Sequence, residues 1–138
     1  MGGAITADSG RDRLADIGTE IPEVRLIVLF GSMALGRPRA DSDVDIGVVC
    51  DRAADLDALY IALAPRLQTG RLDLVDLKYA GPLLAFHVAR SGLPLFEREP
   101  GEFRGFQSLA SRRYADTKKL RDAQQRAIQA FLERGRPA

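Results

Sequence analysis

The sequence predicts an α/β domain in which helices pack against a small β-sheet, followed by one further helix at the C-terminus. Three observations lead to this fold class. The chain has 138 residues, enough for one domain with a hydrophobic core. Its composition, 46% hydrophobic and 28% charged, is that of an ordinary globular protein. Short apolar runs alternate with amphipathic segments through the first hundred residues, as expected of a sheet covered by helices.

Four apolar runs predict the strands. Each is short, rich in β-branched or other apolar residues, and bounded by charged, glycine or proline positions. We expect the strands at residues 24–30, 43–49, 71–77 and 93–97.

Apolar residues at helical spacing predict the helices. We expect them at 9–19, 52–68, 82–92 and 106–133, with one or two helical turns at 32–35. Ser9 is the expected cap of the first helix, Pro65 is expected to end or kink the second early, and Gly92 is expected to close the third. We assign residues 1–100 to the folded domain and residues 101–138 to a C-terminal helical extension.

Charge and composition exclude several classes of protein. No run approaches the length of a membrane span, and the first residues lack the features of a signal peptide, so we expect a cytoplasmic protein without a membrane partner. Cys50 is the only cysteine, which excludes an internal disulfide and a cysteine-based zinc site. Residues 1–103 carry 11 Lys or Arg against 16 Asp or Glu, whereas residues 104–138 carry 9 against 3. Such a basic tail can contact a polyanion, but we favour a solvated helix face over direct nucleic-acid binding.

Two aspartates at the start of the second predicted strand are the first candidate functional residues. Asp43 and Asp45 are two positions apart, so they point to the same face of a strand. Carboxylates about 7 Å apart repel each other unless a cation lies between them. Oxygen ligands without a nearby His or Cys suit a hard ion such as Mg²⁺. The third strand offers Asp73 and Asp76, which face opposite ways, and alternation alone does not decide which one joins the pair.

Gly31 and Ser32 follow the first predicted strand and supply the complementary chemistry. A glycine there permits a tight turn and close approach of a ligand. Ser32 would cap the following helical turn, whose free N–H groups favour an anion. A phosphate-binding turn beside metal-binding carboxylates indicates a metal–triphosphate site.

These residues carry a resemblance to a known family. Gly31-Ser32, ten intervening residues and Asp43-x-Asp45 resemble the GS-x10-D-x-D signature of the DNA polymerase β-like nucleotidyltransferases. The chain from about residue 20 to 98 is most similar to the minimal nucleotidyltransferases (MNT), antitoxins that are paired with HEPN toxins. The resemblance implies a small mixed sheet of the α+β kind as the nucleotidyltransferase core.

The resemblance also implies roles for these residues. Gly31 and Ser32 would hold the β- and γ-phosphates of ATP, and Asp43, Asp45 and Asp73 would bind Mg²⁺ as the catalytic carboxylates. The implied reaction is AMP transfer from ATP to a hydroxyl, with a tyrosine of a HEPN ribonuclease toxin as acceptor and the toxin as binding partner.

Three questions stay open at this point. The acceptor could instead be a small molecule, or the chain could be an antitoxin that neutralises by binding alone. Arg37 and Arg39 could neutralise a triphosphate or be solvated loop charges. The 106–133 helix could fold back on its own sheet or dock on a partner through a few apolar residues, namely Leu120, Ala127, Ile128 and Phe131.

Overall fold

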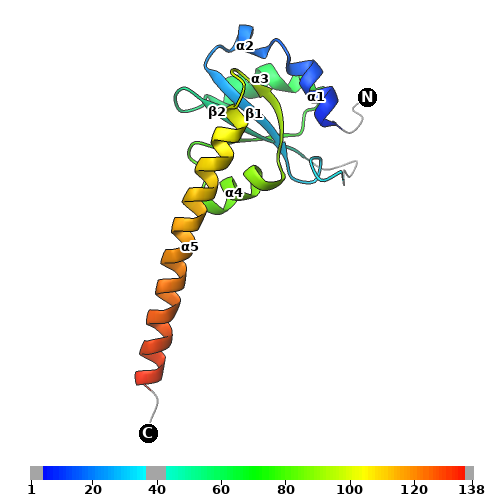
Figure 1. The fold of residues 1–138 in the computed structure, drawn as a ribbon. Coiled ribbons are helices and arrows are strands. Elements are labelled where there is room, and N and C mark those ends of the chain that lie inside the picture. The colour runs from blue at the N-terminus through cyan, green and yellow to red at the C-terminus, as the bar shows by residue number, and fades with distance from the viewer. Residues whose placement is uncertain (1–4, 37–42, 136–138) are drawn as a thin grey trace.

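The computed structural model describes residues 5–36 and 43–135 of the chain (Figure 1). Within these residues, one four-stranded sheet has the order β3-β2-β1-β4. Its strands are β1 (Val24–Phe30), β2 (Val44–Cys50), β3 (Leu72–Asp76) and β4 (Leu93–Glu97). Strand β1 pairs antiparallel with β2 and β4, whereas β2 and β3 are parallel. The sheet is therefore mixed, and the predicted fold class is confirmed.

One face of the sheet is covered by three helices near the N-terminal and middle parts of the chain, α1 (Ala7–Leu14), α2 (Ile17–Glu20) and α3 (Leu56–Leu67). Alternate strand residues point to this side because the strand period is two. The core formed there includes Ile27, Leu29, Val44, Ile46 and Val48 from the strands and Leu14, Ile17, Leu59, Leu63 and Leu67 from the helices. This layer holds the scaffold together and leaves the other face for the polar residues of β2 and β3.

The second face is covered by α4 (Pro82–Ser91) and by the beginning of α5 (Glu102–Arg134). Its core contains Leu26, Val28 and Leu77 from the strands and their edges, and Ala85, Val88, Ala89 and Ala110 from the helices. Gly92 joins α4 to β4 where a Cβ would collide with the Val88 carbonyl oxygen and with the Val28 side chain. The predicted end of the 82–92 helix at this glycine is confirmed, and the cause is close packing.

Several predicted helix boundaries are wrong for local reasons. The N-cap of α1 is Thr6, whose side chain accepts a hydrogen bond from the Ser9 backbone N–H, while the hydroxyl oxygen of Ser9, the third helical residue, accepts one from the Thr6 backbone N–H. The predicted 9–19 helix is two short helices. Helix α3 runs through Pro65 to Leu67, because a proline in the last turn removes little of the hydrogen-bond ladder.

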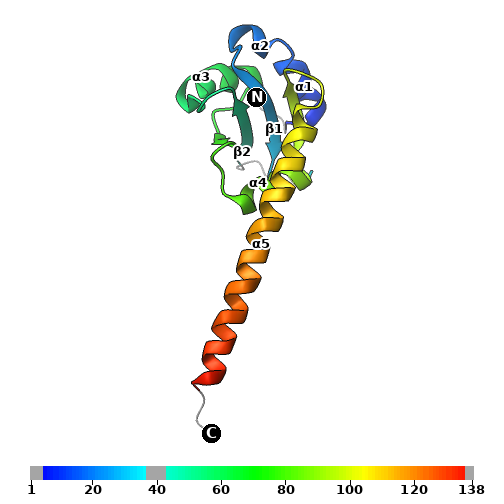
Figure 2. The same ribbon diagram turned by 60° about the vertical axis from the view of Figure 1, so that its left-hand side comes forward.

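Helix α5 is longer than predicted and only its first half packs on the domain. It begins at Glu102, after Gly101 in a left-handed conformation, and includes 33 residues. The Tyr114 ring stacks on Phe86 of α4 with centroids 4.1 Å apart, and Thr117 is the last half-buried residue before a long exposed stretch. Figure 2 shows the remainder of α5 extending away from the sheet and from α4. Helices that meet the length and hydropathy needed to cross a bilayer are absent from the described part of the chain.

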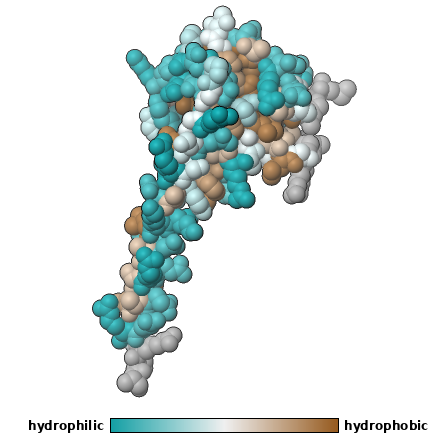
Figure 3. Space-filling view, in the orientation of Figure 1, coloured by the Kyte–Doolittle hydropathy of each residue, from teal (hydrophilic) through white to brown (hydrophobic). Residues whose placement is uncertain are grey.

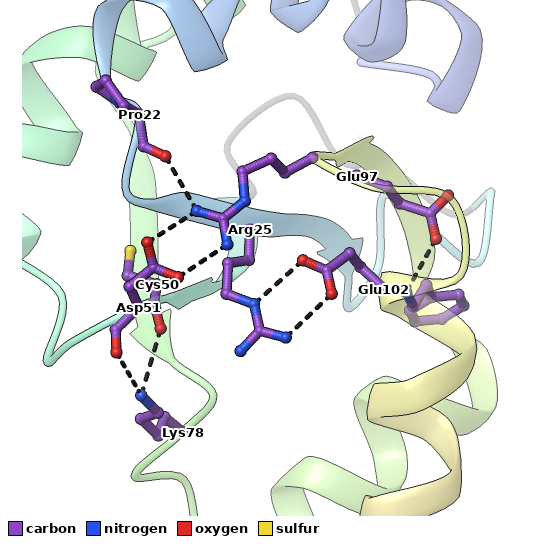
Figure 4. Close-up of polar contacts among 9 residues, drawn as sticks. Pro22, Arg25, Cys50, Asp51, Lys78, Glu97 and Glu102 are labelled. Carbon is purple, nitrogen blue, oxygen red and sulfur yellow. Dashed lines mark hydrogen bonds and ion pairs between the residues drawn. The ribbon is translucent and has the colours of Figure 1, made fainter.

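Polar contacts fix the start of α5 to the sheet (Figure 4). The Arg25 guanidinium in β1 donates two hydrogen bonds of 3.1 Å to the Glu102 carboxylate. Glu97 at the end of β4 accepts a hydrogen bond of 2.9 Å from the Phe103 backbone N–H. Because β1, β4 and α5 are joined side chain to side chain and side chain to backbone, the direction of the helix is set by the sheet.

Candidate functional site

The turn after β1 lies directly against a carboxylate of β2. Gly31 has φ of +74°, a left-handed conformation that favours glycine, and a Cβ at this position would collide with Asp45 Oδ2. The Leu35 N–H donates to the Gly31 carbonyl oxygen at 3.2 Å, and the Gly36 N–H donates to that of Met33 at 3.3 Å. Residues 31–36 therefore form hydrogen-bonded turns in place of the predicted helical turns, and Ser32 stands at their start.

Asp45 and Asp73 are direct neighbours on the second face of the sheet. They are register partners in the parallel β2–β3 pair, and Asp45 also faces Phe30, the residue before Gly31. Burial raises the pKa of Asp45, and the nearby charges of Asp73 and Asp43 and a side-chain hydrogen bond with Asp73 raise it further. A partly buried carboxylate beside other acidic side chains is a place where a cation is stabilising.

Asp43 lies at the entrance of β2, one residue before the strand begins. Its Oδ1 is 3.9 Å from Nε of Arg71, and both side chains are exposed. Arg71 precedes β3 as Asp43 precedes β2, and the Arg71 carbonyl oxygen accepts a hydrogen bond of 2.7 Å from the Val44 N–H. The sequence reasoning missed Arg71; its signal would have been the matching position of the two residues at the start of parallel strands.

Asp76 lies at the opposite end of β3 and has a structural role. Its Oδ2 accepts a hydrogen bond of 2.8 Å from the Ala54 N–H, and its Oδ1 accepts one of 3.1 Å from the Lys78 N–H. Of the two acidic residues that the sequence left open on this strand, Asp73 is therefore the one beside Asp45. Arg37 and Arg39, the candidate triphosphate contacts, lie outside the described residues.

The donor chemistry at this end of the sheet fits a divalent metal in type. It offers carboxylate oxygens from Asp45 and Asp73, side by side, and from Asp43 two residues before Asp45. In the described residues these side chains do not converge as a group of three or more ligands. The Asp43 carboxylate lies instead against Arg71.

Comparison with known protein families gives a match over most of this domain. Residues 12–101 match the family described as "Polymerase beta, Nucleotidyltransferase". A protein adenylyltransferase MntA of Aphanizomenon flos-aquae is 32% identical over 130 residues, covering 84% of this chain and 85% of the relative. An MntA of Shewanella oneidensis is 37% identical over 79 residues, covering 55% of this chain and 56% of the relative.

Solved structures give the same picture at the level of the fold. One chain from a crystal structure of a toxin–antitoxin with AMP-PNP has a TM-score of 0.69 and 27% identity, covering 91% of this chain and 99% of that one. Another comes from the tri-AMPylated Shewanella oneidensis HEPN toxin in complex with the MNT antitoxin, with a TM-score of 0.65 and 25% identity, covering 90% and 99%. The similarity thus extends over nearly the whole chain.

Proposed function

This chain belongs to the polymerase β nucleotidyltransferase family, and from that premise we propose that it is the antitoxin of a toxin–antitoxin pair that transfers AMP from ATP to its toxin. The acceptor is a tyrosine hydroxyl of a HEPN ribonuclease. The hydroxyl oxygen attacks the α-phosphorus of ATP, the bond from that phosphorus to the β-phosphate oxygen breaks, and pyrophosphate leaves. Each transfer adds one AMP to the toxin.

The proposed roles follow from the positions of the residues. Gly31 and Ser32 hold the β- and γ-phosphates, since the turn at residue 31 has no side chain between its backbone and the ligand. Asp43, Asp45 and Asp73 would hold Mg²⁺, which when bound would supply positive charge at the reacting phosphate. Asp73 also takes the proton of the acceptor hydroxyl as general base. The chain itself contributes by positioning ATP and the acceptor hydroxyl and by compensating the charge of the reacting groups.

The partner and the compartment are inferred from relatives. The solved complexes that resemble this chain contain a HEPN toxin, and in one of them the toxin is tri-AMPylated. We therefore assign nucleotidyl transfer to residues 1–100, treat residues 101–138 as an extension that serves the partner, and place the reaction in the cytoplasm, where ATP and Mg²⁺ are abundant.

The observation that carries the proposal is the contact of three elements at one end of the sheet. Gly31 has no room for a side chain because Asp45 lies over it, and Asp45 adjoins Asp73. This arrangement supports a site where phosphate and metal meet, because the turn and the carboxylates share one small region. A chain that had lost the activity would be free to lose this crowding of like charges.

Labelled ATP provides the test. The chain is mixed with the purified HEPN toxin that it is proposed to modify, ATP and MgCl₂, and AMP on the toxin is followed by mass spectrometry. We expect Asp45→Asn to lower the rate by roughly 10²–10³-fold, the size found when one preorganised electrostatic group is removed. Asp57→Asn, which removes an exposed carboxylate from α3 on the other face of the sheet, is the matched control.

Two results would contradict the proposal. Labelling by Asp45→Asn at the wild-type rate would remove the catalytic assignment. Full neutralisation of the toxin by Asp45→Asn, without any AMP on it, would show an antitoxin that acts by binding alone. Labelling of a small-molecule hydroxyl in place of the toxin would change the acceptor but not the site.

A further inference from the structure

The second half of α5 exposes large apolar side chains along its length. Between Lys118 and Arg134 the helix extends for about 25 Å, at 1.5 Å per residue. Figure 3 shows apolar atoms along this stalk among hydrophilic ones. The exposed fractions are 59% for Leu120, 59% for Ile128, 73% for Phe131 and 56% for Leu132. We call these four residues the apolar stripe; no other described residue of the chain covers them.

The apolar stripe continues the face that packs on the domain in the first half of the helix. Ala110 is buried against the sheet and Tyr114 stacks on Phe86. Ile128 and Leu132 lie five turns, about 18 residues, further along the helix, and therefore point to the same side as Ala110 and Tyr114. A single face thus runs through the whole of α5, and only its first half is used within this chain. Such a face is typical of a helix that packs along its full length.

Charge indicates what kind of surface covers the apolar stripe. Residues 115–134 carry five Lys or Arg and three Asp or Glu, whereas residues 1–103 are acidic, with 11 against 16. Two such basic helices side by side would repel each other. A partner that carries Asp and Glu beside an apolar groove would be attracted instead.

The direction of α5 places such a partner near the catalytic residues. In both ribbon views the C-terminal end of β1, where Gly31 follows, and the free half of α5 point to the same end of the molecule (Figures 1 and 2). The bidentate Arg25–Glu102 contact and the Glu97–Phe103 contact hold the base of the helix. A protein bound to the apolar stripe would therefore lie at the end of the sheet that carries Asp45.

We propose that the free half of α5 is the docking surface for the acceptor protein, through a groove on that protein that is apolar and bordered by acidic residues. This inference rests on the proposed function, because the acceptor is the toxin named there. Docking on α5 brings the tyrosine of the acceptor to Asp73, and so the apolar stripe determines which protein is modified.

A pair of variants of equal charge tests the docking surface. Ile128→Asp with Phe131→Asp places two carboxylates in the apolar stripe. Ala123→Asp with Ala130→Asp adds the same charge on another side of the helix, since these residues lie 13 and 20 positions after Ala110 and are turned by about 140–160° from it. Affinity for the same purified HEPN toxin is measured by calorimetry at two salt concentrations. AMP transfer to that toxin and binding of AMP-PNP with Mg²⁺ to the free chain are measured alongside.

We expect the stripe variant to lose roughly 30-fold or more in affinity for the acceptor protein, as when central interface residues are removed. AMP transfer should fall with it, whereas AMP-PNP binding stays at the wild-type level. The control variant should change affinity by less than about threefold. Wild-type affinity should decrease as salt rises.

The remaining outcomes separate this inference from the proposed function. If the stripe variant binds and labels the acceptor like wild type, or if both variants lose binding equally, the docking surface is wrong and the enzyme stands. If wild type neither binds nor labels the HEPN-type protein, the proposed function fails and the docking surface fails with it. If the free chain is a dimer in ultracentrifugation and the stripe variant is a monomer, the occupant is a second copy and the inference is overturned.

Discussion

The two ends of the β2–β3 pair treat their acidic side chains in opposite ways. At the end near the start of α5, the Arg98 guanidinium donates hydrogen bonds of 2.8 and 2.9 Å to Asp51, and two backbone N–H groups donate to Asp76. At the end near Gly31, Asp45 and Asp73 face each other. The pKa of Asp51 is lowered by its hydrogen bonds with Arg98, whereas burial and neighbouring carboxylates raise the pKa of Asp45.

We interpret this contrast as a division between acidic residues that stabilise the fold and acidic residues that are available to bind a cation. Carboxylates with cation or N–H partners stabilise the connections between strands and helices. Carboxylates that crowd one another gain a partner only when a cation arrives. Four experiments test this division.

The two acids of β3 should show the largest difference. Asp73→Ala is expected to lower AMP transfer by roughly 10²–10⁴-fold, the range for a lost general base, with unchanged stability. Asp76→Ala is expected to lower the free energy of unfolding by about 1–3 kcal/mol, because the Ala54 and Lys78 N–H groups lose their acceptor. Transfer assays and urea denaturation measure both. Equal loss of activity in the two folded variants would contradict the division.

Mg²⁺ should stabilise the protein by binding at the Gly31 end of the sheet and not at the other end. A ligand at a hundred times its Kd raises the free energy of unfolding by about 2.7 kcal/mol. We expect added MgCl₂ to raise the Tm of wild type and EDTA to reverse the rise. The Tm of Asp45→Asn should change little on addition of MgCl₂. Asp51→Asn, at the other end, should respond like wild type. A Tm increase of the same size in Asp45→Asn would place the ion elsewhere.

Removing the ion pair at the base of α5 should have a smaller effect. Arg25→Ala is expected to lower the free energy of unfolding by about 0.5–1 kcal/mol, since the Arg25 side chain is partly exposed to water. Glu102→Ala should cost a similar amount, and the double variant little more than either. Urea denaturation of the three proteins gives the coupling. Fully additive losses would show that the contact itself contributes nothing.

The Asp51–Arg98 pair should produce the smallest effect, visible as a change with pH. The folded pKa of Asp51 is lowered below its unfolded value near 3.9. The contribution of Asp51 to the free energy of unfolding is therefore present above that unfolded pKa and is lost as the pH falls through the folded pKa. Asp51→Asn should narrow the stability difference between pH 7 and pH 3. An unchanged difference in denaturant midpoint would show that the pair is decoupled from folding.

The sequence predicted the strands well because their signal is local. Runs such as Val24–Phe30 combine apolar residues with a glycine at the end, and the predicted and observed boundaries differ by at most one residue at either end. The helix ends were harder to predict, because caps depend on single side chains. Thr6 and not Ser9 is the N-cap of α1, and α5 begins at Glu102, four residues before the predicted start. Whether a helix face is covered cannot be read from one chain's periodicity.

The candidate site was predictable in part for the same reason. Spacing predicts Asp43 and Asp45 at the start of one strand and Gly31 at the end of another; the structure has Asp45 in β2 and Asp43 one residue before it. The choice between Asp73 and Asp76 depends on the parallel register of β2 with β3, a long-range property that alternation does not contain. The Arg71–Asp43 contact depends on the same register, which explains why it was missed.

Because α5 is one continuous helix, the number of residues in it determines the direction in which its later side chains point. Each inserted or deleted residue rotates everything that follows by about 100° around the helix axis. A single deletion between Thr117 and Leu120 would leave the sheet in place, yet would turn Phe131 to another side of the helix. Outside the apolar stripe, substitutions along the exposed half of the helix are therefore expected to be tolerated, whereas changes in its length are expected to be tolerated only in steps close to whole turns.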